Sequence, residues 1–524
     1  MDIPRRYNAA HDLIERNLQA GRADKLAYID DEGEYSYGTL AARVDRCAAG
    51  LRAIGLEPEQ RVLLCLNDTV DFPVVFLGCI KTGIVPVAVN TMLKTQDYEY
   101  LLADSRAQAV VVSASLYPML QPVLARSPVR HVLVSQAELP GTRSLAQLLE
   151  TTPRQRVAPQ DTCADEPCFW LYSSGSTGQP KGTVHAHASL ILTAELYAGP
   201  ILQMRESDVV FSAAKLFFAY GLGNSLTFPL AFGATAVLMA ERPTAEAVYA
   251  RLRRHQPTLF CGVPTLYASL LATAQAPSAQ ELRLRACVSA GECLPPSIGA
   301  AWSKRFDVDI LDGIGSTEML HIFLSNRPGE VHYGTTGMPV PGYEVRLLDD
   351  QGQPVREGEI GELQVRGPTS ALHYWNNREK SRHTFHGPWT RTGDKYHRNA
   401  QGRYVHAGRA DDMLKVGGIY VSPVEVETAL LSHPAVREVA VVGKEDAAGL
   451  IKPLAFVVVH SGTSADSGLA ETLKQHVKTQ LAPYKYPRSI EFLSELPKTA
   501  TGKIQRFRLR EMIQSTRTDL PAVD

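Results

Sequence analysis

The chain carries almost no net charge. Lys and Arg total 54 against 55 for Asp and Glu, so the formal net charge is -1 over 524 residues. A protein that holds nucleic acid or an anionic membrane by its overall field needs a marked excess of basic residues. The sequence therefore argues against both partners, and an anionic ligand must be bound by local groups.

Cysteine pairs at metal-ligand spacing are also missing. The eight cysteines are scattered, with no CxxC pair and no His/Cys cluster, which argues against a zinc site and favours reduced thiols. No apolar stretch follows the basic residues of the N-terminal segment MDIPRRYNAAHDLIERN, so we expect no secretory signal. The expected location is the cytoplasm.

One uncharged run, Leu216 to Ala240, is long enough to span a bilayer. Asn224, Pro229 and several glycines interrupt it, and no positive cluster flanks it. We therefore interpret this run as a buried helix and strand beside a pocket rather than as a membrane span.

The first 310 residues alternate between short apolar runs and helical patterns. Helices are expected at Phe72–Thr82 and Tyr267–Ala274, and the apolar runs are RVLLCL, VPVAV, AQAVVVS, VRHVLVS, TLFCGV and RACVSAG. Continuous Val, Ile and Leu runs between helices are typical of parallel strands buried on both faces. This part therefore predicts a large α/β body.

The pattern changes twice further along the chain. From about residue 340, short alternating strands flank turns rich in Asp, Gly and Asn, which predicts an antiparallel, barrel-like subdomain. After Arg409 we expect a smaller α+β domain with strands near 437–444 and 454–460, a helix near Leu469–Leu481 and a strand at SIEFL. The polar segment GRADD is the candidate boundary, which gives domains of residues 1–410 and 411–524.

A loop rich in hydroxyls and glycines follows a buried strand. Residues Tyr172 to Gly182 read YSSGSTGQPKG, directly after the apolar run Cys168–Leu171. Backbone N–H groups and hydroxyls in such a loop can bind phosphate oxygens, and Lys181 adds positive charge. GxxxxGK[ST] does not fit, because Pro180 precedes the lysine, and no GxSxG elbow marks a serine nucleophile. The loop predicts a phosphate site of another type.

This loop resembles the signature of the adenylate-forming superfamily, which includes acyl-CoA synthetases, peptide-synthetase adenylation domains and beetle luciferases. Other segments similar to the family's motifs follow in the same order: Ser289–Glu292, Asp312–Glu318, Gly361–Gly367, Thr392–Asp394, Gly408–Asp412 and Pro497–Lys503. The resemblance covers nearly the whole chain. It implies an α/β fold, in which a large N-terminal domain has two α/β subdomains and a distorted β-barrel, followed by a small mobile α+β C-terminal domain.

The resemblance also implies a binding site for ATP. Thr317 would hydrogen-bond the α-phosphate, Glu318 would hold Mg²⁺, and Asp394 would accept hydrogen bonds from the ribose hydroxyls with Arg409 close by. The remaining phosphate-binding residues would be Ser173, Ser174, Gly175, Ser176, Thr177, Gly178 and Lys181. The adenine slot would be lined by Ala290, Gly291, Glu292, Asp312 and Gly313. At Gly313 many relatives carry an aromatic residue that stacks on adenine, so here stacking would be weaker or would come from Ile314.

Two steps of chemistry follow from the resemblance. ATP and a carboxylate repel each other, so the α-phosphate needs cations and donors before it can be attacked. Lys503 would supply one of them, whereas no general base is needed because a carboxylate is already ionised at pH 7. Asp411 would be the hinge of the small domain between adenylate and thioester formation. Gly417 and Gly418 would line the path of the pantetheine arm of CoA, because glycine permits close approach of the backbone.

The family's acyl pocket is built from three segments that are apolar and aromatic here. They are Leu216–Asn224, Cys261–Thr265 and Met319–Ile322, and they contain no Lys, Arg, Asp or Glu. An amino-acid substrate would need an acidic partner for its ammonium group, so peptide-synthetase function is disfavoured. Phe217, Phe218 and Tyr220 suit a flat aromatic ring.

The phrase FFAYGLGNSLTFPL resembles that of benzoate–CoA ligases. By that match the substrate residues would be Phe218, Ala219, Tyr220, Gly221, His321 and Ile322. The substrates would be an aromatic carboxylate, ATP and CoA. Hydroxybenzoates, whose hydroxyl Tyr220 or His321 could bind, and medium-chain fatty acids remain alternatives, as do an ATP-binding protein without ligase activity and a light-emitting relative. Either a monomer or a homodimer is compatible with the sequence.

Overall fold

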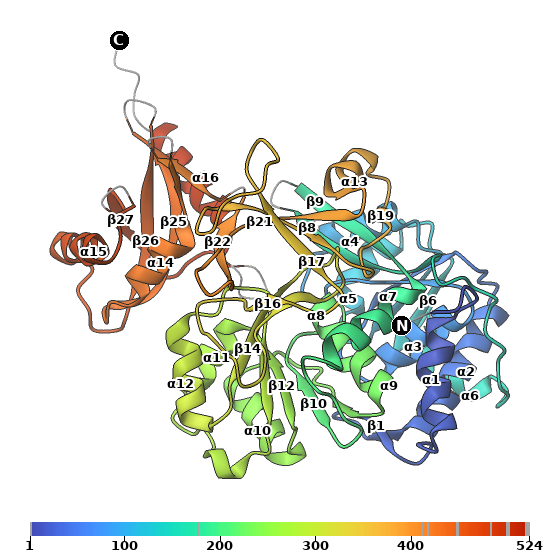
Figure 1. Cartoon of the computed structure of the whole chain (residues 1–524). Coiled ribbons are helices and arrows are strands. Elements are labelled where there is room, and N and C mark those ends of the chain that lie inside the picture. The colour runs from blue at the N-terminus through green and yellow to red at the C-terminus, as the bar shows by residue number, and fades with distance from the viewer. Residues whose placement is uncertain are drawn as a thin grey trace. The chain divides into compact units, whose positions relative to one another are not determined.

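The chain divides into two compact units. A computed structural model describes residues 3–175, 178–410, 412–416, 419–446, 450–482, 485–498 and 504–518. The first unit comprises Met1–Val345 and Val365–Arg391, and the second comprises Arg346–Gln364 and Thr392–Asp524 (Figure 1). The domain boundary at residue 411 falls outside the described residues and stays a prediction.

Two sheets form the body of the first unit. One has nine strands in the order β16-β15-β14-β13-β12-β10-β11-β1-β2, and its run from β14 to β1 is parallel. Its strands are β1 (Leu26–Ile29), β2 (Glu34–Ser36), β10 (Val209–Ser212), β11 (Thr235–Val237), β12 (Leu259–Gly262), β13 (Ala286–Ser289), β14 (Ile310–Gly315), β15 (Ile322–Ser325) and β16 (Met338–Pro339). The parallel strands expected in this part of the chain are confirmed.

The second sheet of this unit has eight strands in the order β19-β9-β8-β4-β3-β5-β6-β7. From β8 to β7 the pairing is parallel, whereas β8–β9 and β9–β19 are antiparallel. Its strands are β3 (Arg61–Cys65), β4 (Val85–Ala88), β5 (Ala109–Ser113), β6 (His131–Ser135), β7 (Arg143–Ser144), β8 (Pro167–Gly175), β9 (Gly178–Ala186) and β19 (His373–Tyr374). The antiparallel edge carries the phosphate loop.

Helices accompany these strands in alternation, as parallel pairing requires a crossover. They are α1 (Ala9–Gln19), α2 (Tyr37–Ala53), α3 (Asp71–Lys81), α4 (Thr95–Ser105), α5 (Tyr117–Leu124), α6 (Leu145–Thr151), α7 (His187–Thr193), α10 (Ala245–His255), α11 (Pro264–Ala272), the 3-10 helix η3 (Ala279–Glu281), α12 (Pro296–Phe306) and α13 (Arg378–Thr384). The two helices predicted from sequence are confirmed as α3 and α11.

The uncharged run is broken into short elements. The π-helical η1 (Ala194–Ala198) and strand β10 precede the run. Within the run lie α8 (Ala219–Leu222), the π-helical η2 (Gly223–Thr227) and α9 (Phe228–Phe232). Gly233 caps the C-terminus of α9, and β11 follows. Gly233 has φ 74°, in the left-handed region that ends a helix without strain in glycine. Within the described residues no helix combines the length and hydropathy needed to cross a bilayer.

The second unit contains the small α+β pattern. Its three-stranded sheet has the order β25-β26-β27, from β25 (Val436–Glu445), β26 (Ile451–Val459) and β27 (Ser489–Phe492), with α14 (Pro423–Leu431), α15 (Ser467–Gln480) and α16 (Arg506–Thr518) as its helices. A hairpin of β23 (Leu414–Val416) and β24 (Ile419–Val421) precedes α14. The strands and helix expected after Arg409 are therefore confirmed.

The antiparallel region after residue 340 is a five-stranded sheet. Its order is β17-β18-β21-β20, with β22 also paired to β21. Its strands are β17 (Glu344–Leu348), β18 (Gly361–Arg366), β20 (Phe385–His386), β21 (Trp389–Arg398) and β22 (Tyr404–Arg409). The pairings of β20 with β21 and of β21 with β22 are antiparallel, as predicted.

A buried carboxylate links the two sheets of the first unit. Asp68, in the loop after β3, is 2% exposed and accepts the N–H of Leu216, in the loop after β10, at 3.2 and 3.3 Å. Burial raises the pKa of Asp68 to about 6, although Lys215 and the Leu216 N–H oppose the shift. Lys215 donates from Nζ to the carbonyl of Glu241 at 2.7 Å. Asp68 thus holds the start of the predicted acyl-binding segment.

We expect Asp68→Asn to remove a pH dependence of stability. Because the folded-state pKa lies above the unfolded value, ionisation of Asp68 costs folding free energy as pH rises through 6. Relative to Asp68→Asn, the wild type should lose about 1 kcal/mol of unfolding free energy between pH 5 and pH 8. Urea unfolding of both proteins at the two pH values measures it. If the difference in unfolding free energy between the two proteins were the same at pH 5 and pH 8, Asp68 would not titrate in this range.

Candidate active site

The phosphate loop is the turn of an antiparallel hairpin. Strands β8 and β9 pair Tyr172 with Gly182, Ser173 with Lys181 and Gly175 with Gly178. The predicted residues Ser176 and Thr177 at its tip lie outside the described residues. The register places Ser173 and Lys181 opposite each other at the base of the loop.

Helix α4 fastens both strands of this hairpin. Tyr172 donates from Oη to Oδ2 of Asp104 at 2.7 Å, and Tyr100, one helical turn earlier, donates to the carbonyl of Pro180 at 3.0 Å. Trp375 donates from Nε1 to the Asp104 carbonyl at 2.9 Å. These two hydrogen bonds from tyrosine hydroxyls hold opposite strands at the base of the loop. Neither of them uses a backbone N–H group of the loop.

Glu318 lies beside this hairpin, in the segment after β14. Its Oε1 accepts hydrogen bonds from Tyr374 at 2.7 Å and from Ser173 at 3.4 Å. The preceding carbonyl, of Thr317, accepts a bond of 2.8 Å from Nε2 of His185 on β9. Burial lowers the pKa of His185 to about 4, so the imidazole is neutral and Nε2 is the protonated nitrogen. The structure therefore brings Ser173, Thr317 and Glu318 together.

A single carboxylate suits the cation that accompanies ATP. Among the residues that the structure describes, no three His, Cys, Asp or Glu side chains gather into a metal cage. Mg²⁺ keeps several waters and is usually held by one or two carboxylates together with substrate phosphates. Glu318, half-buried at the phosphate loop, fits that pattern.

The predicted adenine residues lie at the ends of two neighbouring strands. Ser289 on β13 pairs with Asp312 on β14, so Ala290–Glu292 and Gly313 follow side by side. Asp312 is 4% exposed, and burial raises its pKa well above its usual range. A Cβ at Gly313 would lie 2.8 Å from the Leu324 carbonyl and 2.9 Å from Ile322. The missing aromatic residue at Gly313 thus has a steric reason, since β15 occupies its space.

The predicted ribose residues lie together in the second unit. Asp394 on β21 is paired in register with Arg409 on β22, whose Nη1 donates to Oδ1 at 3.1 Å and to Oδ2 at 3.2 Å. His406 Nε2 lies 3.5 Å from Oδ1. Burial alone would raise the pKa of Asp394, but the Arg409 and His406 contacts outweigh it and hold the pKa below its usual value. The carboxylate is therefore ionised and can accept hydroxyl protons.

Three aromatic rings, of which only Tyr220 was predicted to contact the substrate, surround the buried imidazole of the predicted residue His321. His321 is 2% exposed, and its ring centroid lies 4.6 Å from Phe228, 5.1 Å from Tyr197 and 5.7 Å from Tyr220. A Cβ at Gly223 would lie 2.4 Å from His321 Cδ2, so glycine is required there. Burial lowers the pKa of His321 to about 3, which keeps the ring neutral. Phe217 and Phe218 pack against each other at 4.4 Å, and Ile322 is 1% exposed.

Tyr220 cannot donate its proton to a ring substituent without losing other bonds. Its hydroxyl donates to the carbonyls of Val288 at 3.0 Å and Gly262 at 3.3 Å. The sequence suggested Tyr220 as a partner for a hydroxybenzoate hydroxyl. In the structure that proton already fastens α8 to the ends of β12 and β13.

Several predicted residues lie outside the part of the chain that the structure describes. Asp411, Gly417, Gly418 and Lys503 lie outside the described residues, as does the side chain of Ser174. Their roles stay predictions. Conversely, sequence reasoning missed His185, Asp104 and Tyr374, because no motif marks a residue whose partner is far away in the chain.

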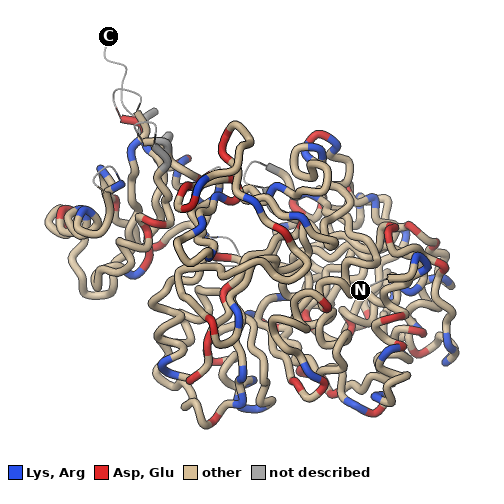
Figure 2. The backbone as a smooth tube through the Cα atoms, viewed as in Figure 1, with Lys and Arg blue, Asp and Glu red and all other residues tan. Residues whose placement is uncertain are grey.

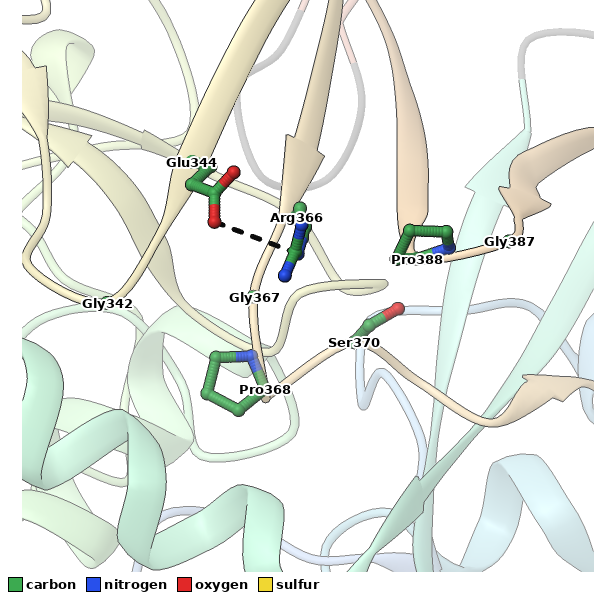
Figure 3. Close-up of a pocket in the computed structure, with 8 residues that line it drawn as sticks. All are labelled: Gly342, Glu344, Arg366, Gly367, Pro368, Ser370, Gly387 and Pro388. Carbon is green, nitrogen blue, oxygen red and sulfur yellow. Dashed lines mark ion pairs between the residues drawn. The ribbon is translucent and has the colours of Figure 1, made fainter.

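The motif Gly361–Gly367 ends at an open hollow of about 450 Å³ in the first unit. Figure 3 shows Arg366 and Glu344 facing each other across it, with Nε to Oε1 at 3.7 Å. Gly342, Gly367, Pro368, Ser370, Gly387 and Pro388 complete its lining. The opposite charges of the pair cancel, which matches the mixing of basic and acidic residues along both units in Figure 2.

Comparison with known proteins shows the family of the chain. A family model described as AMP-binding enzyme matches residues 14–375, and one described as AMP-binding enzyme C-terminal domain matches residues 425–503. The chain is 63% identical over 512 residues to a benzoate–CoA ligase of Thauera aromatica, covering 97% of this chain and 96% of that protein. It is 52% identical to a 4-hydroxybenzoate–CoA/benzoate–CoA ligase of Rhodopseudomonas palustris, covering 97% and 94%.

Solved structures give the same result. A benzoate CoA ligase from Burkholderia xenovorans is 54% identical, with a TM-score of 0.90 over 96% of this chain and 100% of that one. The anthranilate CoA ligase AuaEII, in complex with anthranoyl-AMP, is 42% identical, with a TM-score of 0.93 over 99% of both chains. The chain belongs to the AMP-binding enzyme family of the adenylate-forming superfamily.

Proposed function

We propose that this chain is an AMP-forming ligase that joins benzoate to CoA. Benzoate attacks the α-phosphate of ATP, pyrophosphate leaves, and the thiol of CoA then displaces AMP from benzoyl-adenylate. The observation that carries the ligase chemistry is the grouping of Ser173, Lys181, Thr317 and Glu318 around one hairpin. The identity of 63% to a benzoate–CoA ligase over nearly the whole chain supports the choice of benzoate.

Within this proposal the charged residues act on phosphates. Lys181 and the backbone donors of the loop neutralise and orient the triphosphate, and Lys503 stabilises charge on the α-phosphate during attack. Mg²⁺, held by the Glu318 carboxylate, would screen the phosphate oxygens from the incoming carboxylate. Asp394 accepts hydrogen bonds from the ribose, and Arg409 keeps that carboxylate ionised.

The neutral residues act on the acyl group. Tyr220, held by the carbonyls of Val288 and Gly262, and the uncharged ring of His321 would present aromatic side chains to a flat ring. No charged side chain lies in Leu216–Asn224 or Met319–Ile322. Such walls favour an unsubstituted aromatic acid over one whose substituent needs a hydrogen bond.

The first test is the choice of acid. We expect kcat/KM for benzoate to exceed that for 4-hydroxybenzoate by roughly 10- to 100-fold, because an unpartnered hydroxyl costs about 1–3 kcal/mol on burial. His321→Ala should open space and shift relative activity towards 4-substituted benzoates. AMP release is measured with benzoate, 4-fluorobenzoate, 4-hydroxybenzoate and hexanoate. His131→Ala, a histidine on β6, serves as the control. A preference for hexanoate would overturn the aromatic substrate.

The second test separates the two half-reactions. Lys503→Ala should slow benzoate-dependent ATP–pyrophosphate exchange by roughly 100-fold or more, because charge stabilisation of a few kcal/mol is lost. Supplied benzoyl-adenylate should still react with CoA at the wild-type rate. Lys474→Ala, on the surface helix α15, should leave both half-reactions unchanged. If Lys503→Ala slowed both to the same degree, the lysine would not be specific to adenylation.

A further inference from the structure

The segment that carries Glu318 is held by a loop much later in the chain. Between β18 and β19, Thr369 donates from Oγ1 to the Met319 carbonyl at 2.8 Å, and the N–H of Ala371 donates to the Glu318 carbonyl at 2.7 Å. Tyr374 then donates from Oη to Oε1 of Glu318 at 2.7 Å. The loop thus fixes both the backbone and the side chain of Glu318.

Tyr374 is itself tightly held. It is 3% exposed and is paired in register with Thr183 of β9. Its N–H donates to Oγ of Ser381 at 3.0 Å, and its ring packs at 5.2 Å against Phe385. A buried side chain fixed at its backbone and at its ring presents its hydroxyl in one direction.

The face of the same ring contacts the lysine of the phosphate loop. Lys181 Nζ lies 4.7 Å from the centroid of the Tyr374 ring, within the range of a cation–π interaction. One neutral side chain therefore touches the cation and the anion that serve the phosphates. The Tyr374 ring thus contacts Lys181, and its hydroxyl contacts Glu318.

The hydrogen bonds also select which oxygen of Glu318 is left for a cation. Ser173 and Tyr374 both donate to Oε1. From the described side chains and backbone, Oε2 receives no hydrogen bond. A carboxylate oriented before the ligand arrives loses less conformational entropy on binding than a freely rotating one.

We propose that Tyr374 is a positioning residue of the adenylation reaction, which aims Glu318 at the cation of ATP and supports Lys181. The inference rests on the proposed role of Glu318. Tyr374 acts through these two residues. Its loss should therefore affect the cation and ATP but leave benzoate binding and the CoA step intact.

Tyr374→Phe tests the hydroxyl alone, because the ring that supports Lys181 remains. Mn²⁺ serves as the probe, and its dissociation constant in the presence of ATP is measured by electron paramagnetic resonance, without turnover. We expect a rise of about 10- to 100-fold, as for the loss of a hydrogen bond to a charged group. The KM for benzoate and the rate from supplied benzoyl-adenylate should not change.

Tyr7→Phe is the matched control. Tyr7 also donates from its hydroxyl to a carboxylate, Oδ2 of Asp12 at 2.6 Å, and lies just before α1. Its loss should leave Mn²⁺ affinity unchanged. Equal Mn²⁺ affinities of the Tyr374→Phe and Tyr7→Phe proteins would overturn the proposal, as would a Tyr374→Phe defect confined to benzoate.

Two further variants make the result decisive. In a Glu318→Gln background, Tyr374→Phe should add little to the loss of Mn²⁺ affinity, because both changes act on one group. A full additional loss would contradict action through Glu318.

If Tyr374→Phe does not fold, Ser381→Ala provides the second variant, because it removes the acceptor of the Tyr374 N–H. It should raise the Mn²⁺ dissociation constant by a smaller factor, and no rise would count against the proposal. Failure of the wild type to ligate benzoate would refute the proposed function, whereas the Mn²⁺ measurements would still test Tyr374.

Discussion

The antiparallel ladder between β8 and β9 is the constraint on which the site depends. The strands from β8 to β7 run parallel, so their carboxyl ends meet at one edge of the sheet, where ligands of α/β proteins bind. By turning back at that edge, the hairpin places the phosphate loop there and offers β9 as a template for β19. The β9–β19 pairing places Tyr374 within hydrogen-bonding distance of Glu318. Strand β9 itself places His185 within hydrogen-bonding distance of the Thr317 carbonyl. Without this ladder, His185 and Tyr374 would not be held beside the Thr317–Glu318 segment.

Burial affects the predicted site residues of the two units differently. His185 and His321, with pKa values lowered to about 4 and about 3, stay uncharged at neutral pH. Asp394, by contrast, is kept ionised by Arg409 and His406 although it is buried. Within the proposed function, a neutral His321 would place no positive charge beside the acyl group. The positive charge needed at phosphorus would then come from the lysines and the cation that the proposal places there.

Much of the fold could be read from the sequence because its signals are local. Continuous apolar runs predicted the parallel strands, and α3 and α11 appeared within a few residues of their predicted places. The motifs located Ser173, Lys181, Glu318, Asp394 and Arg409, and the structure groups the first three around one hairpin and the last two on paired strands. Tyr374 and Asp68 could not be found in this way, because their roles depend on bonds to residues 56 and 148 positions away. The backbone acceptors of the Tyr220 hydroxyl could not be read from the sequence either, because they lie on β12 and β13, 42 and 68 positions away.

The packing around His321 bears on the proposed choice of acid. Three rings and Gly223 hold the imidazole, and a Cβ at residue 223 would overlap it. Tyr220 donates its proton to backbone carbonyls, whereas both ring nitrogens of His321 are buried and make no hydrogen bond to the described residues. Within the proposed function, His321 is therefore the group at which a substituted acid could find a polar partner. His321 lies only three residues after Glu318, so a change in this segment would bear on the proposed ATP site as well as on the proposed acyl site.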